Sequence, residues 1–397
     1  MRYRYILLLI LGVDALILLL QTTELSISNK ELHILYGDSS FLQFFINLSL
    51  KLFSNNDFAL RIPMISLHLM SAILLYKTLE NYILLNKDRL WVILVFVLLP
   101  GVMSSAIVVN SAGFIIFGLS LFIYLYQNFN EKYSYIVLII YAFIDKDFLY
   151  LFFSLILFSI YSKNNRFLIL NTILFLISFI LYGLHIKGSP SGHFLDTIGI
   201  YATVFSPIIF IYIFYVLYKK YLLKEFDILW FIASPVLLFS LLLSFRQKIE
   251  IEHFAPYIIV ALPLFAQTFI SSYRVRLKMF RKTYKNIFIL TFSLLVVYSL
   301  IIFFNKEFYS VIENPKKHFA YKMHIAKELA QLLKDKNIRC VETKEKMAER
   351  LKFYGIKKCK ANRLQEIALE TQKRGSVTVS YAQRVVYRAN VTKINNR

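Results

Sequence analysis

Apolar runs recur along the first three quarters of this chain of 397 residues. They are long enough to cross about 30 Å of hydrocarbon, which takes roughly 17–25 residues in a helix. Hydrophobic residues make up 58% of the sequence, and the mean hydropathy is +0.57. These values exclude an ordinary soluble domain and indicate an integral membrane protein.

The runs predict a polytopic α-helical membrane protein with about eleven spans. We expect these spans at about 5–20, 62–83, 90–109, 113–127, 133–144, 148–162, 167–185, 200–218, 227–245, 254–272 and 286–304. The first span has a basic start and no small-x-small cleavage site, so we interpret it as an uncleaved signal anchor. It contains one carboxylate, Asp14, which we interpret as bonding to a neighbouring helix rather than as a functional group.

Lys and Arg accumulate in alternate loops, as the positive-inside rule requires. With a cytoplasmic N-terminus, the inside loops include 86–89, 162–166, 219–225 and 273–285, and the last carries six Lys or Arg and no acid. An odd number of spans then places Asn305–Arg397 outside. We therefore expect two domains, a transmembrane domain 1–304 with a first outer loop 21–61, and a soluble domain 305–397.

The polar tail 305–397 predicts a small basic α/β domain. It holds 22 Lys or Arg against 9 Asp or Glu, a net charge of +13. The pattern predicts helices at 320–335, 344–353 and 363–373, and strands at 338–342, 355–359 and 376–381. Such a domain either attracts anionic lipids or glycans at the membrane surface, or is merely soluble and basic.

The two cysteines, Cys340 and Cys359, both lie in this tail, and an outside location permits a disulfide between them. The histidines show no metal-ligand spacing, so we expect no metal. No phosphate-binding loop, dinucleotide fingerprint or serine-nucleophile elbow is present.

The loop 21–61 between the first two spans is the first place to look for chemistry. Two carboxylates, Glu31 and Asp38, lie near its start, and Arg61 and Pro63 lie at its end. A carboxylate just past a span can meet a lipid-linked substrate as a general base, or it can be a solvated loop residue. Asp38 also suits a turn or a helix N-cap, and Arg61 suits either an interfacial position or contact with a phosphate.

Further cations lie on the same predicted side of the membrane. Lys146 sits between two aspartates in a hairpin of two short spans, where it either pairs with these neighbours or binds a phosphate. Arg246, Lys248 and His253 precede the tenth span and form either a phosphate clamp or an ordinary wet loop.

Several motifs follow one another in a fixed order over residues 1 to about 270. They are SNKELHILY, GDSSFLQFF, LFSNNDFALRIP, Pro100 in the third span, FIDKDFLY with Lys146, and His253-Phe-Ala-Pro256-Tyr followed by Pro263. In this order the sequence resembles the GT-C glycosyltransferases, in the group of protein O-mannosyltransferases and lipid A aminoarabinose transferases (family 39-like). It departs from their pattern where Lys30 replaces the first acid of an Asp-Glu pair, Ser39-Ser40 replaces Pro-Pro, and His253 replaces an Arg.

The resemblance implies a glycosyltransferase in the inner membrane of a bacterium. Its donor would be a sugar on polyprenyl phosphate, and its acceptor an envelope lipid, glycan or protein on the outer side. Membrane lipids, the donor and the acceptor are the expected partners, with no nucleic acid and no further cofactor. Glu31 and Asp38 would then be catalytic, and the donor phosphate would meet Lys146, Arg61, Arg246, Lys248 and His253.

Two other functions stay open from the sequence. A lipid or polysaccharide transporter (flippase) would be expected to show internal repeats and broken helices at the membrane midplane, and no repeat is visible. A catalytically inactive GT-C-like scaffold is also consistent with the departures from the family pattern.

Overall fold

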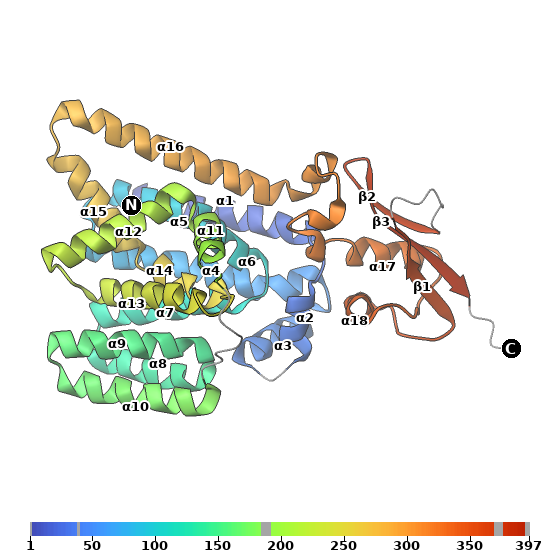
Figure 1. Cartoon of the computed structure of the whole chain (residues 1–397), viewed down its shortest axis with the longest axis horizontal. Coiled ribbons are helices and arrows are strands. Elements are labelled where there is room, and N and C mark those ends of the chain that lie inside the picture. Colours follow the sequence, from blue (N-terminus) through green and yellow to red (C-terminus); the bar gives the residue numbers. More distant parts are fainter. Residues whose placement is uncertain (1, 38–39, 184–191, 369–375, 394–397) are drawn as a thin grey trace. The chain divides into compact units, whose positions relative to one another are not determined.

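The computed structural model describes residues 2–37, 40–183, 192–368 and 376–393. The chain divides into two compact units, which are described separately (Figure 1). Unit 1 comprises Met1–Leu16, Met64–Ala106 and Asn110–Ser299, and unit 2 comprises Ile17–Pro63, Ile107–Val109 and Leu300–Arg397. Residues 21–61, which follow the first predicted span, thus belong to the same unit as the C-terminal residues.

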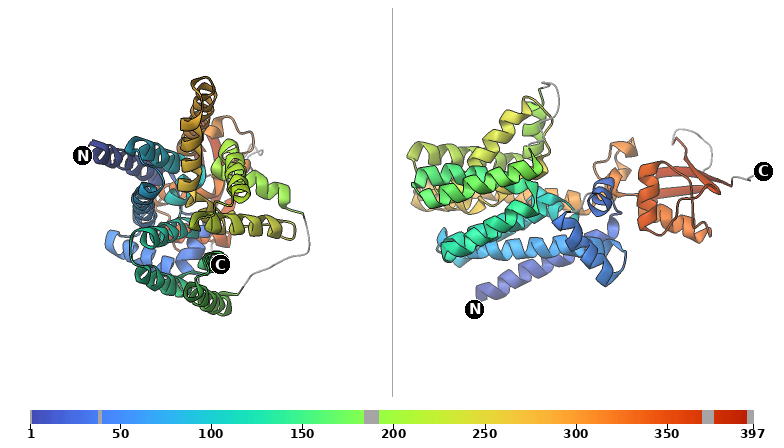
Figure 2. Two further views of the ribbon diagram at one scale, coloured as in Figure 1. Left: turned by 90° about the vertical axis from the view of Figure 1, so that its left-hand side faces the viewer. Right: turned by 90° about the horizontal axis from the view of Figure 1, so that it is seen from below.

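Unit 1 is built of helices. Those that contribute to it are α1 (Arg2–Glu24), α4 (Asp57–Thr78), α5 (Asn86–Leu98), α6 (Pro100–Ile107), α7 (Ser111–Asn128), α8 (Glu131–Ile144), α9 (Leu149–Ser162), α10 (Asn165–Tyr182), α11 (Phe194–Phe205), α12 (Pro207–Leu223), α13 (Ile228–Ser244), α14 (Ala255–Ile259), α15 (Leu262–Val275) and α16 (Lys278–Phe303). Three short 3-10 turns also belong to it, η1 (Leu79–Asn81), η2 (Lys146–Phe148) and η3 (Ile251–His253). Helices α8, α9 and α10 pack side by side (Figures 1 and 2).

Six helices among the described residues are long and apolar enough to cross a membrane. They are Arg2–Glu24, Asp57–Asn81, Ser111–Asn128, Asn165–Tyr182, Ala255–Val275 and Lys278–Phe303, and the number becomes eight if each of two bent helix pairs is one span. The predicted count of eleven spans is therefore wrong, although a helix lies at every predicted position. Helices α8 and α9 have 14 residues each and α13 has 17. At 1.5 Å per residue they extend about 21–26 Å, less than the hydrocarbon thickness of about 30 Å.

The two bent pairs break at prolines. Helices α5 and α6 meet at 61°, and α11 and α12 meet at 104°. Pro100 and Pro207 start the second helix of each pair, where a missing backbone N–H is tolerated. A Cβ on Gly101 would lie 2.5 Å from Cγ1 of Val204, so the backbones near the two breaks approach closely.

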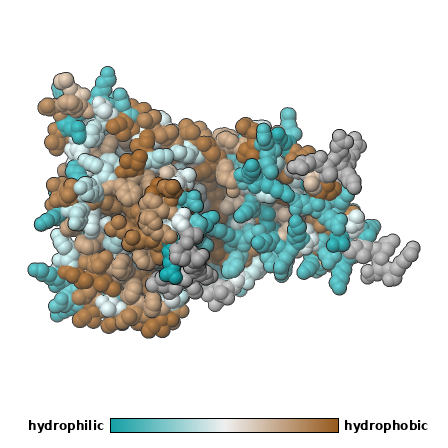
Figure 3. Space-filling view, in the orientation of Figure 1, coloured by the Kyte–Doolittle hydropathy of each residue, from teal (hydrophilic) through white to brown (hydrophobic). Residues whose placement is uncertain are grey.

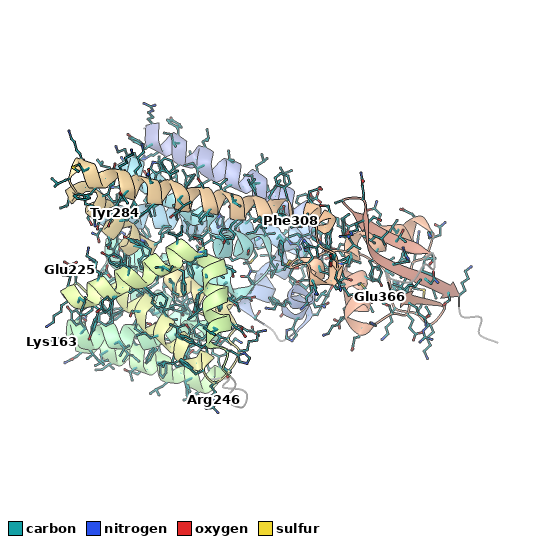
Figure 4. All side chains as sticks on the ribbon, turned by 45° about the horizontal axis from the view of Figure 1, so that its top comes forward. Lys163, Glu225, Arg246, Tyr284, Phe308 and Glu366 are labelled. Atoms are coloured by element: carbon teal, nitrogen blue, oxygen red, sulfur yellow. A yellow bond between two sulfur atoms is a disulfide. The ribbon has the colours of Figure 1, made fainter. Side chains whose placement is uncertain are left out.

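Basic loops gather at one end of unit 1. Lys163 and Glu225 lie at this end, which we call the basic end, and Arg246 lies at the opposite end (Figure 4). Asp88 in the first turn of α5 forms an ion pair with Arg274 in the last turn of α15, which brings these two helix ends together. The arrangement of helix ends agrees with the alternation of basic loops that the sequence predicts.

Several helices of unit 1 carry exposed apolar side chains. In α10 these include Ile169, Ile173, Leu176 and Ile180, and hydrophobic residues cover much of this unit on the face drawn in Figure 3. Within α16, Leu295 is the one residue that is buried. Large exposed apolar surfaces are uncommon on soluble proteins, so the surface fits a lipid environment.

Unit 2 combines short helices with a small sheet. Its elements, besides the ends of helices shared with unit 1, are α2 (Asn29–Tyr36), α3 (Phe41–Phe53), η4 (Asn305–Ser310), η5 (Pro315–Lys317), η6 (Tyr321–Met323), α17 (Ala326–Asp335), α18 (Glu345–Phe353), β1 (Asn362–Glu366), β2 (Val377–Tyr381) and β3 (Arg384–Lys393). The sheet has the order β1-β3-β2, and both pairings are antiparallel. Its inner face packs on α17 and α18 through Leu329, Leu333, Leu351, Val379 and Val386.

The structure corrects three of the elements that the sequence predicts for the tail. The helix predicted at 363–373 is wrong for 363–366, which form most of β1, while 369–373 lie outside the described residues. Strand β1 pairs with β3, and Leu364 is buried in the core, so tertiary pairing outweighs local helix propensity. The segments 338–342 and 355–359 form an isolated bridge rather than regular strands, and Cys340 and Cys359 form a disulfide.

Candidate functional site

Glu31 lies in the first turn of α2 and is fully buried. Ser28 and Glu31 form a capping box, in which the Ser28 backbone N–H donates to Glu31 Oε2 at 2.8 Å. The other oxygen, Oε1, accepts from the Val109 backbone N–H at 3.2 Å. Arg61 Nε lies 3.4 Å from the same oxygen. Each carboxylate oxygen therefore has a partner inside unit 2.

Arg61 is also fully buried, on α4. Its guanidinium donates to the backbone carbonyls of Thr22, Leu25 and Ser26 at 2.8–3.2 Å. These carbonyls lie at the end of α1 and in the turn that follows. Arg61 thus fixes the path of the chain from α1 to α2 and neutralises Glu31 there.

Asp57 extends this buried network. Its Oδ1 accepts from the Tyr354 hydroxyl at 2.6 Å, and its Oδ2 lies 3.1 Å from Nζ of Lys327. Burial, and then the negative charge of Asp57, raise the pKa of Tyr354, which keeps this hydroxyl protonated as a donor. The network therefore joins the start of α4 to α17 and to the residue that follows α18.

Arg350 supplies the last cation of the network. It donates to the backbone carbonyls of Ile27 and His324, each at 2.7 Å, and to Ser26 Oγ at 2.9 Å. The loop 21–61 is thus held to the C-terminal part of unit 2 by buried polar contacts. Such contacts are costly to break because an unpaired buried charge remains.

These contacts indicate a structural role for Glu31. A general base must be within hydrogen-bond reach of its substrate, and Glu31 has no exposed surface and no vacant oxygen. Its catalytic role stays a prediction from the resemblance. Asp38, the second predicted catalytic residue, lies outside the described residues.

A second group of ionisable residues lies at the turn between α8 and α9, in unit 1. Asp145 accepts the backbone N–H of Asp147 through Oδ1 at 2.9 Å, which caps the turn η2. Asp147 is buried, whereas Lys146 is exposed. No ion pair joins Lys146 to either aspartate among the described residues, and Asp147 has a different partner.

That partner is His253, which lies 106 residues further along the chain. His253 Nδ1 lies 2.7 Å from Oδ2 of Asp147, and the Tyr257 hydroxyl donates to the Asp147 carbonyl at 2.6 Å. Nε2 of His253 lies 3.5 Å from the exposed Glu250 carboxylate. Burial disfavours the imidazolium, but the hydrogen bond and charge of Asp147 outweigh it and raise the pKa of His253.

The structure brings Lys146 and His253 together, and their charges act on the same aspartates. Burial, and then the charge of Asp147, raise the pKa of Asp145, while His253 and Lys146 oppose this rise. We call Asp145, Lys146, Asp147 and His253 the hairpin cluster. It combines a carboxylate that protonates readily, an exposed cation and an oriented imidazole.

Arg246 and Lys248 lie on the segment that leads to His253, and both are exposed. Their side chains form no ion pair or hydrogen bond among the residues that the structure describes, so they place uncommitted positive charge on the segment before His253. Arg61, by contrast, belongs to the buried network of unit 2.

Sequence reasoning missed two roles. It treated Asp147 as a neighbour of Lys146, and no local pattern connects position 147 with 253. It also missed Asp57, although Asp57 lies within the quoted motif LFSNNDFALRIP and is four residues before Arg61, the spacing of a helical ion pair. The expected bond from Asp14 to a neighbouring helix is present, since its Oδ2 lies 2.7 Å from Nε2 of His68 on another helix of unit 1.

Comparison with known proteins gives no relative from which a function can be carried over. No protein-family model matches the sequence, and no match is found among the curated proteins or the solved structures. Within the described ranges, no three His, Cys, Asp or Glu side chains come together as a metal site. The functional argument therefore rests on the chain's own residues.

Proposed function

We propose that this protein is a glycosyltransferase of GT-C type in the inner membrane of a bacterium. It would transfer a sugar from a polyprenyl-phosphate carrier to a lipid, glycan or protein on the outer side. The order of motifs over residues 1 to about 270 supports this proposal, as do the helices with apolar surfaces. No resident metal or organic cofactor is needed for this chemistry.

The hairpin cluster is the observation that carries the proposal. In the transfer, the acceptor oxygen bonds to the anomeric carbon while the bond from that carbon to the phosphate oxygen breaks. The electron pair leaves with the phosphate, so exposed cations such as Lys146, Arg246 and Lys248 would stabilise the departing charge. A nearby carboxylate would accept the proton of the acceptor, and the raised pKa of Asp145 suits it to this task.

Two features support an outer location for the cluster and for the C-terminal residues. The loops richest in Lys and Arg belong to the basic end of unit 1, and the cluster belongs to the opposite end. The disulfide between Cys340 and Cys359 fits an oxidising compartment. Labelling a single cysteine placed at Ser376 tests this topology in a variant whose native cysteines are both replaced. Reaction in intact spheroplasts supports it, and reaction only after lysis of the inner membrane contradicts it.

Transfer by purified protein tests the function itself. The assay would offer a pool of polyprenyl-phosphate sugars and envelope acceptors, and would detect the product by mass spectrometry. Lys146→Gln should lower the rate by about 10- to 100-fold, since a hydrogen bond to a charged group contributes about 1.5–3 kcal/mol. Lys163→Gln, an exposed cation at the basic end, is the matched control and should leave the rate unchanged.

A transporter is the second candidate, because unit 1 contains two broken helix pairs whose breaks pack together. Discontinuous helices of this kind form substrate sites in transporters. Movement of a fluorescent polyprenyl-phosphate lipid across proteoliposomes, without chemical transfer, would favour this function. Absence of both activities in a folded protein would favour an inactive scaffold.

A further inference from the structure

An apolar groove opens in unit 1 at a site that the proposed transfer does not use. It has a volume of about 360 Å³ and is lined by α5, α12, α15 and α16. This volume lies within the range of about 300–1,000 Å³ typical of small-molecule sites. The aromatic rings of Trp91, Phe269 and Phe288 form part of the wall, and the Phe288 centroid lies 5.7 Å from that of Trp91 and 5.9 Å from that of Phe269.

The groove is graded from polar to apolar along its length. Asp88, Tyr273, Tyr284 and Lys285 line the part nearest the basic end, and side chains such as Ile208 and Leu262 line the rest. Along α15 the lining runs from Leu262 to Tyr273, about 16 Å at 1.5 Å per residue. This length is close to half of the hydrocarbon thickness of about 30 Å, which is the depth of one leaflet.

The rim of the groove is positively charged. Asp88 is neutralised by Arg274, and Arg276 donates to the Tyr284 hydroxyl at 2.7 Å while lying 4.1 Å above that ring. Lys285 has no ion pair within the part of the chain that the structure describes. The whole segment 273–285 carries six Lys or Arg and no acid.

Exposed apolar residues alternate with these cations. Val275, Leu277, Met279 and Phe280 are all exposed, where the end of α15 meets the start of α16. Basic and apolar residues in alternation are typical of segments that lie at the boundary between lipid headgroups and acyl chains. The mouth of the groove therefore meets the membrane surface.

We propose that this groove binds one anionic glycerophospholipid from the leaflet at the basic end. One acyl chain lies between α15 and α16, and the phosphate lies against Lys285 and the cations of residues 273–285. Binding there also explains how α16 is held, since few of its residues pack against protein. This site does not depend on the proposed glycosyl transfer.

Quenching of Trp91 by brominated lipids tests the proposal directly. The chain has two tryptophans, and Trp230→Phe leaves Trp91 as the single fluorophore. In mixed micelles, brominated phosphatidylglycerol should quench Trp91 at a lower mole fraction than brominated phosphatidylcholine. Lys285→Gln should reduce this preference about fivefold, from about 1 kcal/mol per surface cation. Lys163→Gln, at the same end, should not change it.

A groove-filling variant separates the site from the general lipid annulus. Ala266→Phe places a ring in the groove and should weaken quenching by both brominated lipids. If this variant fails to fold, the comparison of Lys285→Gln with Lys163→Gln still tests whether the groove prefers an anionic lipid. Equal quenching by the two lipids, or an unchanged preference in Lys285→Gln, would overturn the proposal. Displacement of brominated phosphatidylglycerol by polyprenyl phosphate at lower concentration than by phosphatidylglycerol would overturn it too.

Discussion

Two acid–cation pairs, one in each unit, differ in what surrounds them. The pair of Glu31 and Arg61 in unit 2 has no exposed surface, and backbone groups take up its remaining hydrogen bonds. The pair of Asp147 and His253 in unit 1 leaves 22% of the His253 side chain exposed, and exposed Lys146 lies beside it. Both pairs join segments that are far apart in the sequence.

The difference separates a residue that holds the fold from one that can meet a substrate. A saturated buried pair stabilises one chain path but offers no site to a ligand. A partly exposed pair beside an exposed cation, such as Asp147 and His253 beside Lys146, stays accessible to a ligand. We therefore assign stability to Glu31 and Arg61, and the proposed chemistry to the hairpin cluster.

The largest expected effect belongs to Arg61→Met. Removing one partner of a buried ion pair leaves an unpaired buried charge, which costs about 3–5 kcal/mol. Here it also leaves the carbonyls of Thr22, Leu25 and Ser26 without their donor. Thermal unfolding in detergent, followed by circular dichroism, should show a strongly destabilised protein.

Arg246→Met is the matched control for this substitution. Arg246 is exposed and has no ion pair among the described residues, so its loss should change the free energy of unfolding by no more than about 0.5 kcal/mol. Equal free energies of unfolding for Arg61→Met and Arg246→Met would contradict the proposed difference between the two units.

Glu31→Gln should have the next largest effect. Glutamine keeps the size of the side chain and can still complete the capping box, but it removes the charge that neutralises Arg61. We expect a loss of about 3 kcal/mol in the free energy of unfolding. Protease resistance of residues 17–63, read by mass spectrometry, would locate the loss in unit 2. Unchanged resistance would count against a structural role.

The sequence predicts where helices lie better than it predicts how they cross a membrane. Apolar runs locate every helix of unit 1, because burial in lipid or protein demands them. The predicted number of membrane spans is wrong because it depends on helix lengths and helix breaks that packing determines. These are the short helices α8, α9 and α13 and the breaks at Pro100 and Pro207. Composition alone cannot distinguish a short buried helix from a span.

The candidate site was predictable in part. Lys146 and His253 were named from the sequence, and the structure brings them together. Their link through Asp147 joins positions 106 residues apart, which no local pattern contains. The structural role of Glu31 did have a local signal, since Ser28-Asn-Lys-Glu31 matches the Ser-x-x-Glu capping box.

A smaller effect should follow pH, with opposite signs in the two units. Burial, and then the charge of Lys306, lower the pKa of His324 in unit 2 from 6.5 to about 3. Below pH 6.5 the unfolded chain binds a proton at His324 that folded unit 2 does not bind. The contribution of His324 to the free energy of unfolding is therefore present above pH 6.5 and is lost as the pH falls below it. From pH 7 to 5 the loss is about 2 kcal/mol.

The opposite sign applies to His253 in unit 1, whose pKa is raised by Asp147 despite burial. Its contribution is fully present below pH 6.5 and is lost as the pH rises through its folded pKa. Hydrogen exchange at pH 5 and pH 7 should therefore show weaker protection of α17 and stronger protection of the turn between α8 and α9 at the lower pH. His324→Gln should remove the change in α17, and persistence of that change would contradict the assignment.

The most direct test of this division is the transfer rate per folded molecule, measured side by side for Asp147→Asn and Glu31→Gln. Asp147→Asn should remain folded and lower transfer about tenfold, because His253 loses the charge that orients its ring and stabilises its protonated form. Its pH–rate profile should shift to lower pH, which a purely structural defect would not cause. Glu31→Gln should keep the wild-type rate once the loss of folded protein is corrected for. A fully folded Glu31→Gln protein without transfer, beside an active Asp147→Asn protein, would contradict the account and return the catalytic role to Glu31.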